Sequence, residues 1–217
     1  MSDTKTEITM HAGTLRIGIR DALLFTSDDE YPPLCGVWLE WDGESLTATA
    51  TDRFTLGRVT FAGTTVNAPG EPWVLLLPIP GAKAVLGVLR AALREDGARL
   101  VRCTVSGTEL ALSTDDMHFV VTLVAPKFPP PYRTLLAREV PDLTSGAVAI
   151  ASNVIKPFLR VSSDYSAPIR FAVTGPTDPV YVRIGEHFTG LLMPVKTPDI
   201  EAAELARKVK ENSGSAA

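Results

Sequence analysis

The stretch Leu46-Thr-Ala-Thr-Ala-Thr-Asp52-Arg-Phe-Thr-Leu56 decides the fold of this 217-residue chain. Small apolar residues alternate with threonine in its first half, which is the period-2 pattern of a half-buried β-strand. The Thr51-Asp52 step then marks a turn. Asp42-Gly43 lies just upstream, and Asp-Gly between alternating segments is a strong hairpin signal because both turn positions favour positive φ. The pattern predicts three consecutive antiparallel strands, at Leu34–Trp41, Ser45–Ala50 and Thr55–Phe61.

The same order of elements occurs three times, in units of about 50 residues that each run strand, helix, strand, strand, strand. The predicted first strands are Leu15–Ile17, Trp73–Leu77 and Ala147–Ala151, and the predicted helices are Arg20–Asp28, Gly81–Leu93 and Asn153–Ser162. The later strands of units two and three are predicted at Leu100–Val105, Glu109–Ser113, His118–Val124, Ile169–Val173, Val180–Ile184 and Thr189–Val195. One such unit cannot cover both its sheet and its helix, so neighbouring units should complete a shared core.

These repeats predict an α+β fold in which the helices lie on one face of antiparallel sheets. Units one and two should pair as a two-fold-like domain over residues 8–125, with their helices adjacent. A proline-rich linker over 126–144 then leads to the third unit over 145–197. We expect a short helix and a disordered Ser/Gly/Ala tail over 198–217.

Composition and charge exclude several classes of protein. Hydrophobic residues make up 45% and charged residues 21%, so the chain can fold around a core. The net charge of −4 excludes a wholly basic nucleic-acid binder, although not a local basic face. The longest apolar run, Trp73–Pro80, contains two prolines and is too short to cross a membrane. With no apolar targeting segment at the N-terminus, a soluble cytoplasmic protein is expected.

The sequence carries no pattern typical of an enzyme, a cofactor site or a metal site. It holds three histidines and no nucleophile motif, glycine-rich phosphate loop or His/Cys metal spacing. Cys35 and Cys103 are interpreted as small apolar residues of a reducing compartment. The acidic clusters Asp28–Glu30 and Asp115–Asp116 could be imagined as metal ligands, and solvated turns are the preferred interpretation.

Three stretches in this order resemble one known family. Leu46–Leu56 is similar to a hairpin, Lys127-Phe-Pro-Pro-Pro-Tyr-Arg133 to an interdomain segment, and Leu191-Leu-Met-Pro-Val-Lys196 to a C-terminal strand. That family is the bacterial replicative sliding clamp, the beta subunit of DNA polymerase III. The resemblance covers roughly residues 10–196 and implies the DNA-clamp fold. It also implies a DNA-binding, non-enzymatic processivity factor of DNA replication.

The resemblance implies a hydrophobic cleft that takes short peptides from DNA polymerase and other partners. Its lining would be Leu34, Thr51, Arg53, Leu56, Pro129, Leu135, Leu191, Met193, Pro194 and Val195. The alternative for any one of these residues is an ordinary core position. Two departures could shift the peptide preference: Phe54-Thr55 stands where the family has a basic residue, and an extra proline lies within Phe128–Tyr132.

The resemblance also implies that helices face duplex DNA with basic side chains that contact phosphates without sequence preference. The candidates are Arg20, Lys83, Arg90, Arg94, Lys156 and Arg160. Helical spacing places Lys83, Arg90 and Arg94 on one face, and likewise Lys156 and Arg160. The alternative is that these are the ordinary solvent-facing charges of amphipathic helices.

Counting units raises the question of assembly. A family protomer has six units and two protomers close a ring, whereas this sequence shows three units. Because unit three is half a domain with an apolar surface left uncovered, we expect a homo-oligomer: an isologous dimer through unit three, and two dimers closing as a tetramer around DNA. One alternative is a decoy or adaptor that binds partner peptides without encircling DNA. Another is a structural assembly module with neither activity.

Overall fold

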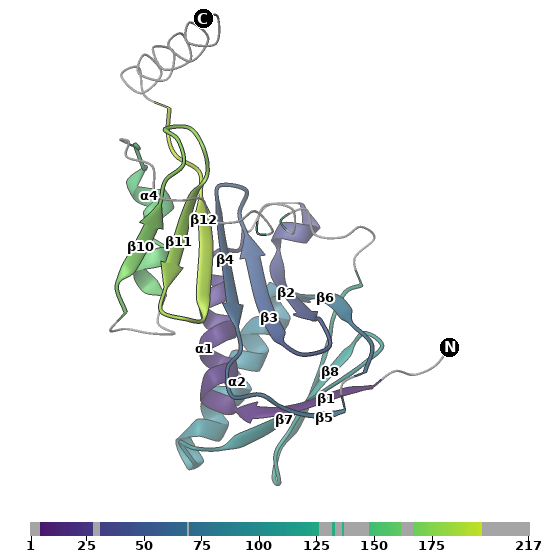
Figure 1. The fold of residues 1–217 in the computed structure, drawn as a ribbon. Helices are drawn as coiled ribbons and strands as arrows, with labels where there is room; N and C mark the ends of the chain where they lie inside the picture. The colour runs from purple at the N-terminus through teal and green to yellow at the C-terminus, as the bar shows by residue number, and fades with distance from the viewer. Residues whose placement is uncertain are drawn as a thin grey trace, which may run out of the picture.

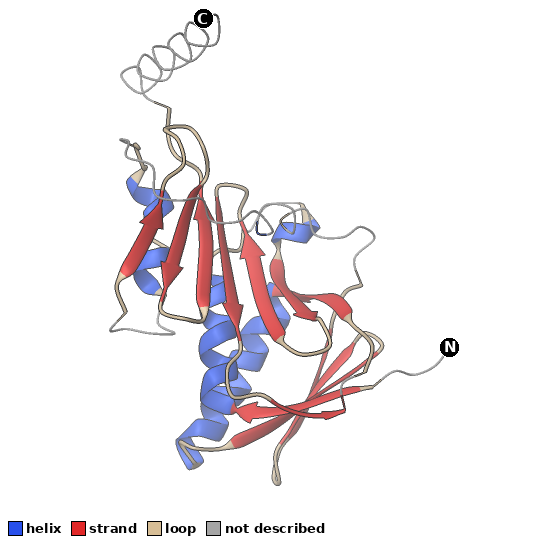
Figure 2. Cartoon of the chain, viewed as in Figure 1, coloured by secondary structure: helices blue, strands red, loops and turns tan. Residues whose placement is uncertain are grey.

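The computed structural model describes residues 5–27, 31–68, 70–125, 132, 136, 148–161 and 167–196. It contains two antiparallel sheets, with helices packed on their inner faces (Figure 1). One sheet has the strand order β5-β1-β7-β8-β9 and the other the order β10-β11-β12-β4-β3-β2-β6. The α+β, helix-on-antiparallel-sheet fold predicted from the sequence is confirmed (Figure 2).

The elements follow the repeated order. Unit one comprises β1 Thr6–His11, α1 Ala12–Leu23, η1 Pro32–Leu34, β2 Gly36–Trp41, β3 Leu46–Thr51, β4 Thr55–Thr60 and β5 Thr65–Ala68. Unit two comprises β6 Trp73–Pro78, α2 Ile79–Glu95, β7 Leu100–Ser106, β8 Glu109–Ser113 and β9 His118–Thr122. Unit three comprises α4 Ser152–Ile155, η2 Phe158–Arg160, β10 Ile169–Ala172, β11 Val180–Ile184 and β12 Phe188–Leu192.

The predicted start of unit one is wrong. Leu15–Ile17 lies inside α1, and the first strand is β1, further upstream. Leu15, Ile19 and Ala22 are buried at the i, i+4, i+7 spacing of a helix that packs on the core. The strand signal was the alternation of Thr6, Ile8 and Met10, all of which are buried.

The predicted third helix is also wrong as a continuous element. Pro157 has no N–H to donate to the carbonyl four residues earlier, so α4 ends at Ile155 and a separate 3-10 turn, η2, follows. Residues 148–151 form no strand, although the backbone N–H of Val195 donates to the carbonyl of Ala149 at 2.8 Å. The predicted linker and C-terminal helix lie almost wholly outside the described residues.

Units one and two interlock by exchanging their first strands. β1 of unit one pairs with β7 of unit two, and β6 of unit two pairs with β2 of unit one. As expected, α1 and α2 lie side by side, behind the seven-stranded sheet in Figure 1. A shared core forms around Ile19 of α1 and Leu89 of α2, both fully buried. Neither unit could cover this core alone.

Unit three joins unit one through a strand seam. β12 pairs with β4 in an antiparallel register that sets Gly190 directly opposite Gly57. Phe25, Phe158 and Phe188 pack over this glycine pair, with ring centroids 4.8, 5.5 and 6.2 Å apart. A Cβ atom at Gly57 would run into the Phe25 ring, so the aromatic cluster needs glycine there.

A buried polar contact fixes the opposite face of the same sheet. Tyr132 is buried, packs edge-on against Trp38 and donates a hydrogen bond to the carboxylate of Glu40. Burial raises the pKa of the Tyr132 hydroxyl well above its usual range, and the nearby charge of Glu40 adds to the effect. The hydrogen bond to Glu40 and the ring contact with Trp38 together hold Tyr132 against β2.

We expect Gly190→Ala to destabilise the fold. The new Cβ would lie 2.7 Å from the backbone oxygen of Leu56 and 2.5 Å from the Phe158 ring, so either the strand or the ring must move. Overpacking of this kind costs about 1–3 kcal/mol, measurable by urea denaturation. Gly87→Ala is the matched control, because nothing lies within 4 Å of its Cβ on the exposed side of α2. Equal stability of both variants would contradict the seam geometry.

We expect Tyr132→Phe to lower the free energy of unfolding at pH 8 by about 1.5–3 kcal/mol, because a buried carboxylate loses a hydrogen bond. The raised pKa sets the sign at alkaline pH: Tyr132 stabilises the fold below about pH 10 and loses that contribution as pH rises further. The variant should therefore show a shallower alkaline decline in stability. The control is Tyr31→Phe, whose ring is exposed, and an unchanged pH profile in Tyr132→Phe would contradict this assignment.

Candidate functional site

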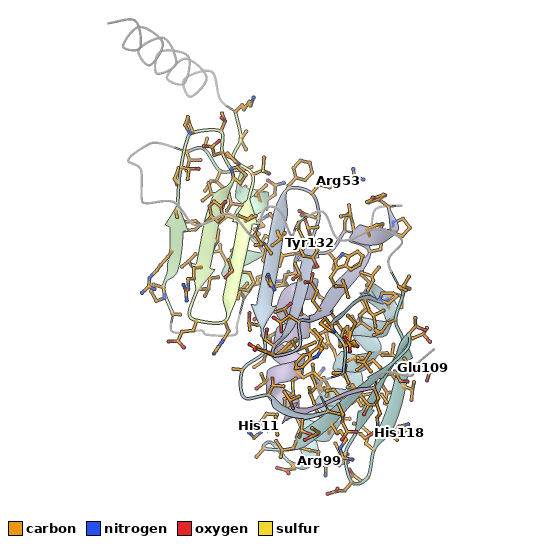
Figure 3. The ribbon with its side chains drawn as sticks, turned by 45° about the vertical axis from the view of Figure 1, so that its right-hand side comes forward. His11, Arg53, Arg99, Glu109, His118 and Tyr132 are labelled. Atoms are coloured by element: carbon orange, nitrogen blue, oxygen red, sulfur yellow. The ribbon has the colours of Figure 1, made fainter. Side chains whose placement is uncertain are left out.

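A groove of about 400 Å³ lies at the seam between units one and three. It is formed by η1, the tip of the β3–β4 hairpin, the end of β12 and Tyr132. We call it the seam groove. Its lining residues are Tyr31, Leu34, Thr51, Arg53, Phe54, Thr55, Leu56, Tyr132, Pro179, Leu191, Leu192 and Met193. In Figure 3, Arg53 lies at the end of the hairpin and Tyr132 over the sheet.

The hairpin tip is built around the carboxylate of Asp52. Oδ1 of Asp52 accepts hydrogen bonds from the backbone N–H groups of Phe54 and Thr55, at 3.0 and 2.6 Å, and from the Thr55 hydroxyl at 2.8 Å. These bonds hold Arg53 at φ +79°, a left-handed conformation unusual for a residue with a side chain. The Thr-Asp turn predicted from sequence therefore sets how Arg53 and Phe54 are presented.

The floor of the groove is apolar and buried. Leu56 of β4 and Leu191 of β12 lie directly opposite each other in the strand register, and both are buried. Because successive strand residues point to opposite faces, both leucines lie on the face away from the glycine pair and α1. The groove therefore opens on the outer side of the sheet.

The rim of the groove consists of exposed apolar side chains whose backbones are linked by a hydrogen bond. Phe54 is 62% exposed and Met193 is 41% exposed. The backbone N–H of Met193 donates to the carbonyl of Phe54 at 2.8 Å, which links the end of β12 to the hairpin tip. The Arg53 guanidinium carbon lies 5.9 Å from the centre of the Tyr31 ring, within reach of a cation–π contact.

The structure brings together six of the ten residues expected to line the cleft. They are Leu34, Thr51, Arg53, Leu56, Leu191 and Met193. Pro194 and Val195 follow β12 but are not among the residues that line the groove. Pro129 and Leu135 lie outside the described residues.

Sequence reasoning missed several lining residues. Phe54 and Tyr132 stood inside the stretches that carried the family resemblance, so their position alone could have suggested them. Tyr31 and Pro179 reach the groove through loops far from these motifs, and no local pattern marks them. An apolar groove with a charged residue at its rim suits binding of apolar side chains from a partner. The described lining offers no pair of groups placed for nucleophilic or acid–base chemistry.

The expected DNA-facing side chains divide into two sets. Lys83, Arg90 and Arg94 are all exposed on the long, continuous helix α2. Arg20 of α1 is half-buried, and its guanidinium lies 3.2 Å from the fully buried carboxylate of Asp21. That ion pair reduces the charge that Arg20 presents to solvent.

Lys156 and Arg160 lie on either side of a break in the predicted third helix. Both are exposed, but Pro157 separates them and they lie at the end of α4 and in η2. The single continuous helix expected to carry both is not formed, and a shared basic face for the two side chains stays a prediction.

The other ionisable clusters have structural explanations. Asp116 accepts hydrogen bonds from the Thr114 hydroxyl and from Arg99, and both lower its pKa. The Asp115–Asp116 cluster is therefore a turn stabilised by its own hydrogen bonds. The other acidic cluster, Asp28–Glu30, lies outside the described residues. Burial raises the pKa of the Cys103 thiol to about 12, which disfavours the reactive thiolate. Across the described segments, no group of three or more His, Cys, Asp or Glu side chains could hold a metal ion.

No protein-family model matches the sequence, and no curated protein sequence matches it either. No helix in the described part of the chain is both long and apolar enough to cross a membrane.

Solved structures do match the fold. The DNA polymerase III subunit beta from Pseudomonas aeruginosa superimposes with a TM-score of 0.68 at 14% identity, over 90% of this chain and 68% of that one. A DNA polymerase sliding clamp from the same organism, solved with ligand, gives 0.72 at 16% identity, over 88% and 67%. The sliding clamp from Bacillus subtilis gives 0.68 at 18% identity, over 88% and 64%. The chain thus spans about two thirds of each clamp, and it has the fold of the bacterial DNA polymerase III beta sliding clamps.

Proposed function

We propose that this protein is a non-enzymatic, cytoplasmic sliding clamp of DNA replication that recruits DNA polymerase and other partners through short peptides. The seam groove carries this proposal. It is an apolar groove on a clamp fold, formed where the hairpin and the C-terminal strand that resemble the clamp family meet. Apolar grooves with a few polar groups at the rim bind short segments through one or two buried anchors.

The shape of the groove indicates how a peptide would bind. Leu56 and Leu191 form a buried floor for an apolar anchor, while Phe54 and Met193 form a rim that can close over it. Methionine adapts its flexible thioether side chain to different neighbours, which suits a site serving several partners. Arg53 stands at the rim and favours a peptide with an acidic residue beside its anchor.

We expect the double variant Phe54→Ala, Met193→Ala to weaken peptide binding about 30-fold, equivalent to about 2 kcal/mol, because it removes the two exposed apolar side chains of the rim that would contact the peptide. Both side chains are largely exposed, so the fold should persist, as circular dichroism would show. The assay is fluorescence anisotropy with a peptide that carries a clamp-binding motif of a bacterial replicative polymerase. Leu100→Ala is the control, as its side chain is 54% exposed away from the groove. Equal affinity of the double variant and the control would refute the proposed groove function.

DNA encirclement is the second part of the proposal. The exposed charges of α2 can attract the phosphate backbone without sequence preference, which permits sliding. A closed ring needs further copies of the chain, and β9 offers an edge for one. β9 occupies in unit two the position of β4 in unit one, and among the described residues only β8 pairs with it. The alternative remains an adaptor that binds peptides but does not encircle DNA.

We expect the protein to be retained on a nicked circular plasmid during gel filtration and lost once the plasmid is linearised, because a ring slides off free ends. The triple variant Lys83→Glu, Arg90→Glu, Arg94→Glu should lose retention, since its charges repel the phosphates. Arg183→Glu is the control, because Arg183 is exposed on β11 and lies on the face of the sheet opposite the core-facing Val182. Intact peptide binding with equal retention on circular and linear DNA would favour the adaptor.

A further inference from the structure

In units one and two, the first strand makes backbone hydrogen bonds along both of its edges. On one side it pairs with the second strand of the other unit: β1 with β7, and β6 with β2. On the other side it contacts the chain that follows the fourth strand of its own unit. β1 pairs there with β5, and Leu76 of β6 exchanges two backbone hydrogen bonds with Val124, of 2.9 and 2.8 Å.

Unit three reproduces only one of these two sides. The N–H of Val195, which follows β12, donates to the carbonyl of Ala149 at 2.8 Å, as the chain after β9 does for β6. Residues 148–151 therefore occupy the place of a first strand. Within the described residues, no second strand pairs with their other side, and only β11 pairs with β10. Unit three therefore has a first-strand segment, residues 148–151, that lacks a second-strand partner. It also has a second strand, β10, that lacks a first-strand partner, so each could supply what the other lacks.

The exposed surface agrees with this gap. Phe171 of β10 lies across from the buried Val182 of β11, so its side chain faces the core side of the sheet, yet it is 37% exposed. The core-facing residues Leu39 of β2 and Val105 of β7 are only 2% and 6% exposed, because β6 and β1 cover them. Leu159 of η2, in the same unit, is 64% exposed. An open, apolar sheet edge is a template for strand addition.

We propose that a second copy of this chain fills the gap by reciprocal strand exchange. Residues 148–151 of each copy pair antiparallel with β10 of the other, as β6 pairs with β2. In the proposed register Val148 lies opposite Phe171, both on the core side of the sheet, and Ala149 lies opposite Arg170. Val148 and Ile150 already face the core of their own unit, so the exchange extends that core across the interface.

A second copy is the occupant that the fold itself indicates. The chain supplies both halves of the missing pair, so one two-fold axis satisfies both edges of both copies and the association closes at two. The helical turns α4 and η2 of the copies would then lie against each other, as α1 and α2 do, and would cover Leu159. This inference goes beyond the proposed function, because it needs neither peptide nor DNA.

The first test is a disulfide across the new interface. In a Cys35→Ala background, the pair Ala149→Cys, Arg170→Cys should give a covalent dimer under mild oxidation, visible on a non-reducing gel. Ala149→Cys with Arg183→Cys is the matched control. Arg183 lies opposite Arg170 but on β11, one strand further from the edge, and should give no dimer. A monomer-only gel for the first pair, or an equal dimer yield for both pairs, would overturn the proposal.

The second test disrupts the edge. The parent chain should sediment at twice its monomer mass or a multiple of that, and Phe171→Lys should shift it to the monomer, because a buried lysine opposes strand addition. Val120→Lys, which places the same charge on the exposed β9 edge, should still form the dimer. Peptide anisotropy on Phe171→Lys separates the two proposals, since the groove is remote from β10 and its affinity should not change. A monomeric parent, or pairing of β10 with other residues of the same chain in hydrogen exchange, would overturn the dimer.

Discussion

The close approach of two backbones at the β4–β12 seam is the constraint on which the rest of the structure depends. Gly57 and Gly190 face each other there, and the rings of Phe25, Phe158 and Phe188 pack onto the space that two side chains would occupy. The same strands present Leu56 and Leu191 on the opposite face of the sheet. One packing event therefore attaches unit three and creates the floor of the groove.

The exchange of first strands explains both the stability of units one and two and the incompleteness of unit three. When two units exchange first strands, the second strand of each unit is paired along its outer edge. Unit three has no second unit with which to exchange a strand, so β10 is left as an edge strand and Phe171 is exposed. Backbone groups at such an edge need partners, and water or a second chain must supply them.

The two proposed binding surfaces lie on opposite sides of the seven-stranded sheet. The seam groove is on the outer face of the sheet, while α1 and α2 pack on its inner face. The exposed basic side chains are those of α2. A net charge of −4 with a local basic helix gives weak, diffuse attraction to phosphates rather than tight binding. A partner peptide and duplex DNA would therefore not compete for the same surface.

The sequence by itself determined most of the strands, the order of elements in the three units and half of the groove lining. Alternation at Leu46–Ala50 and the Thr51-Asp52 turn depend on neighbouring residues only, so local patterns suffice to predict them. Six of the twelve lining residues followed from the family resemblance that the short motifs carry. Tertiary structure alone decided that β1 pairs with β7, that Tyr132 reaches Glu40, and that Tyr31 and Pro179 meet at the groove. These contacts join residues far apart in the chain, and they form because the shared core and the glycine seam bring the strands together.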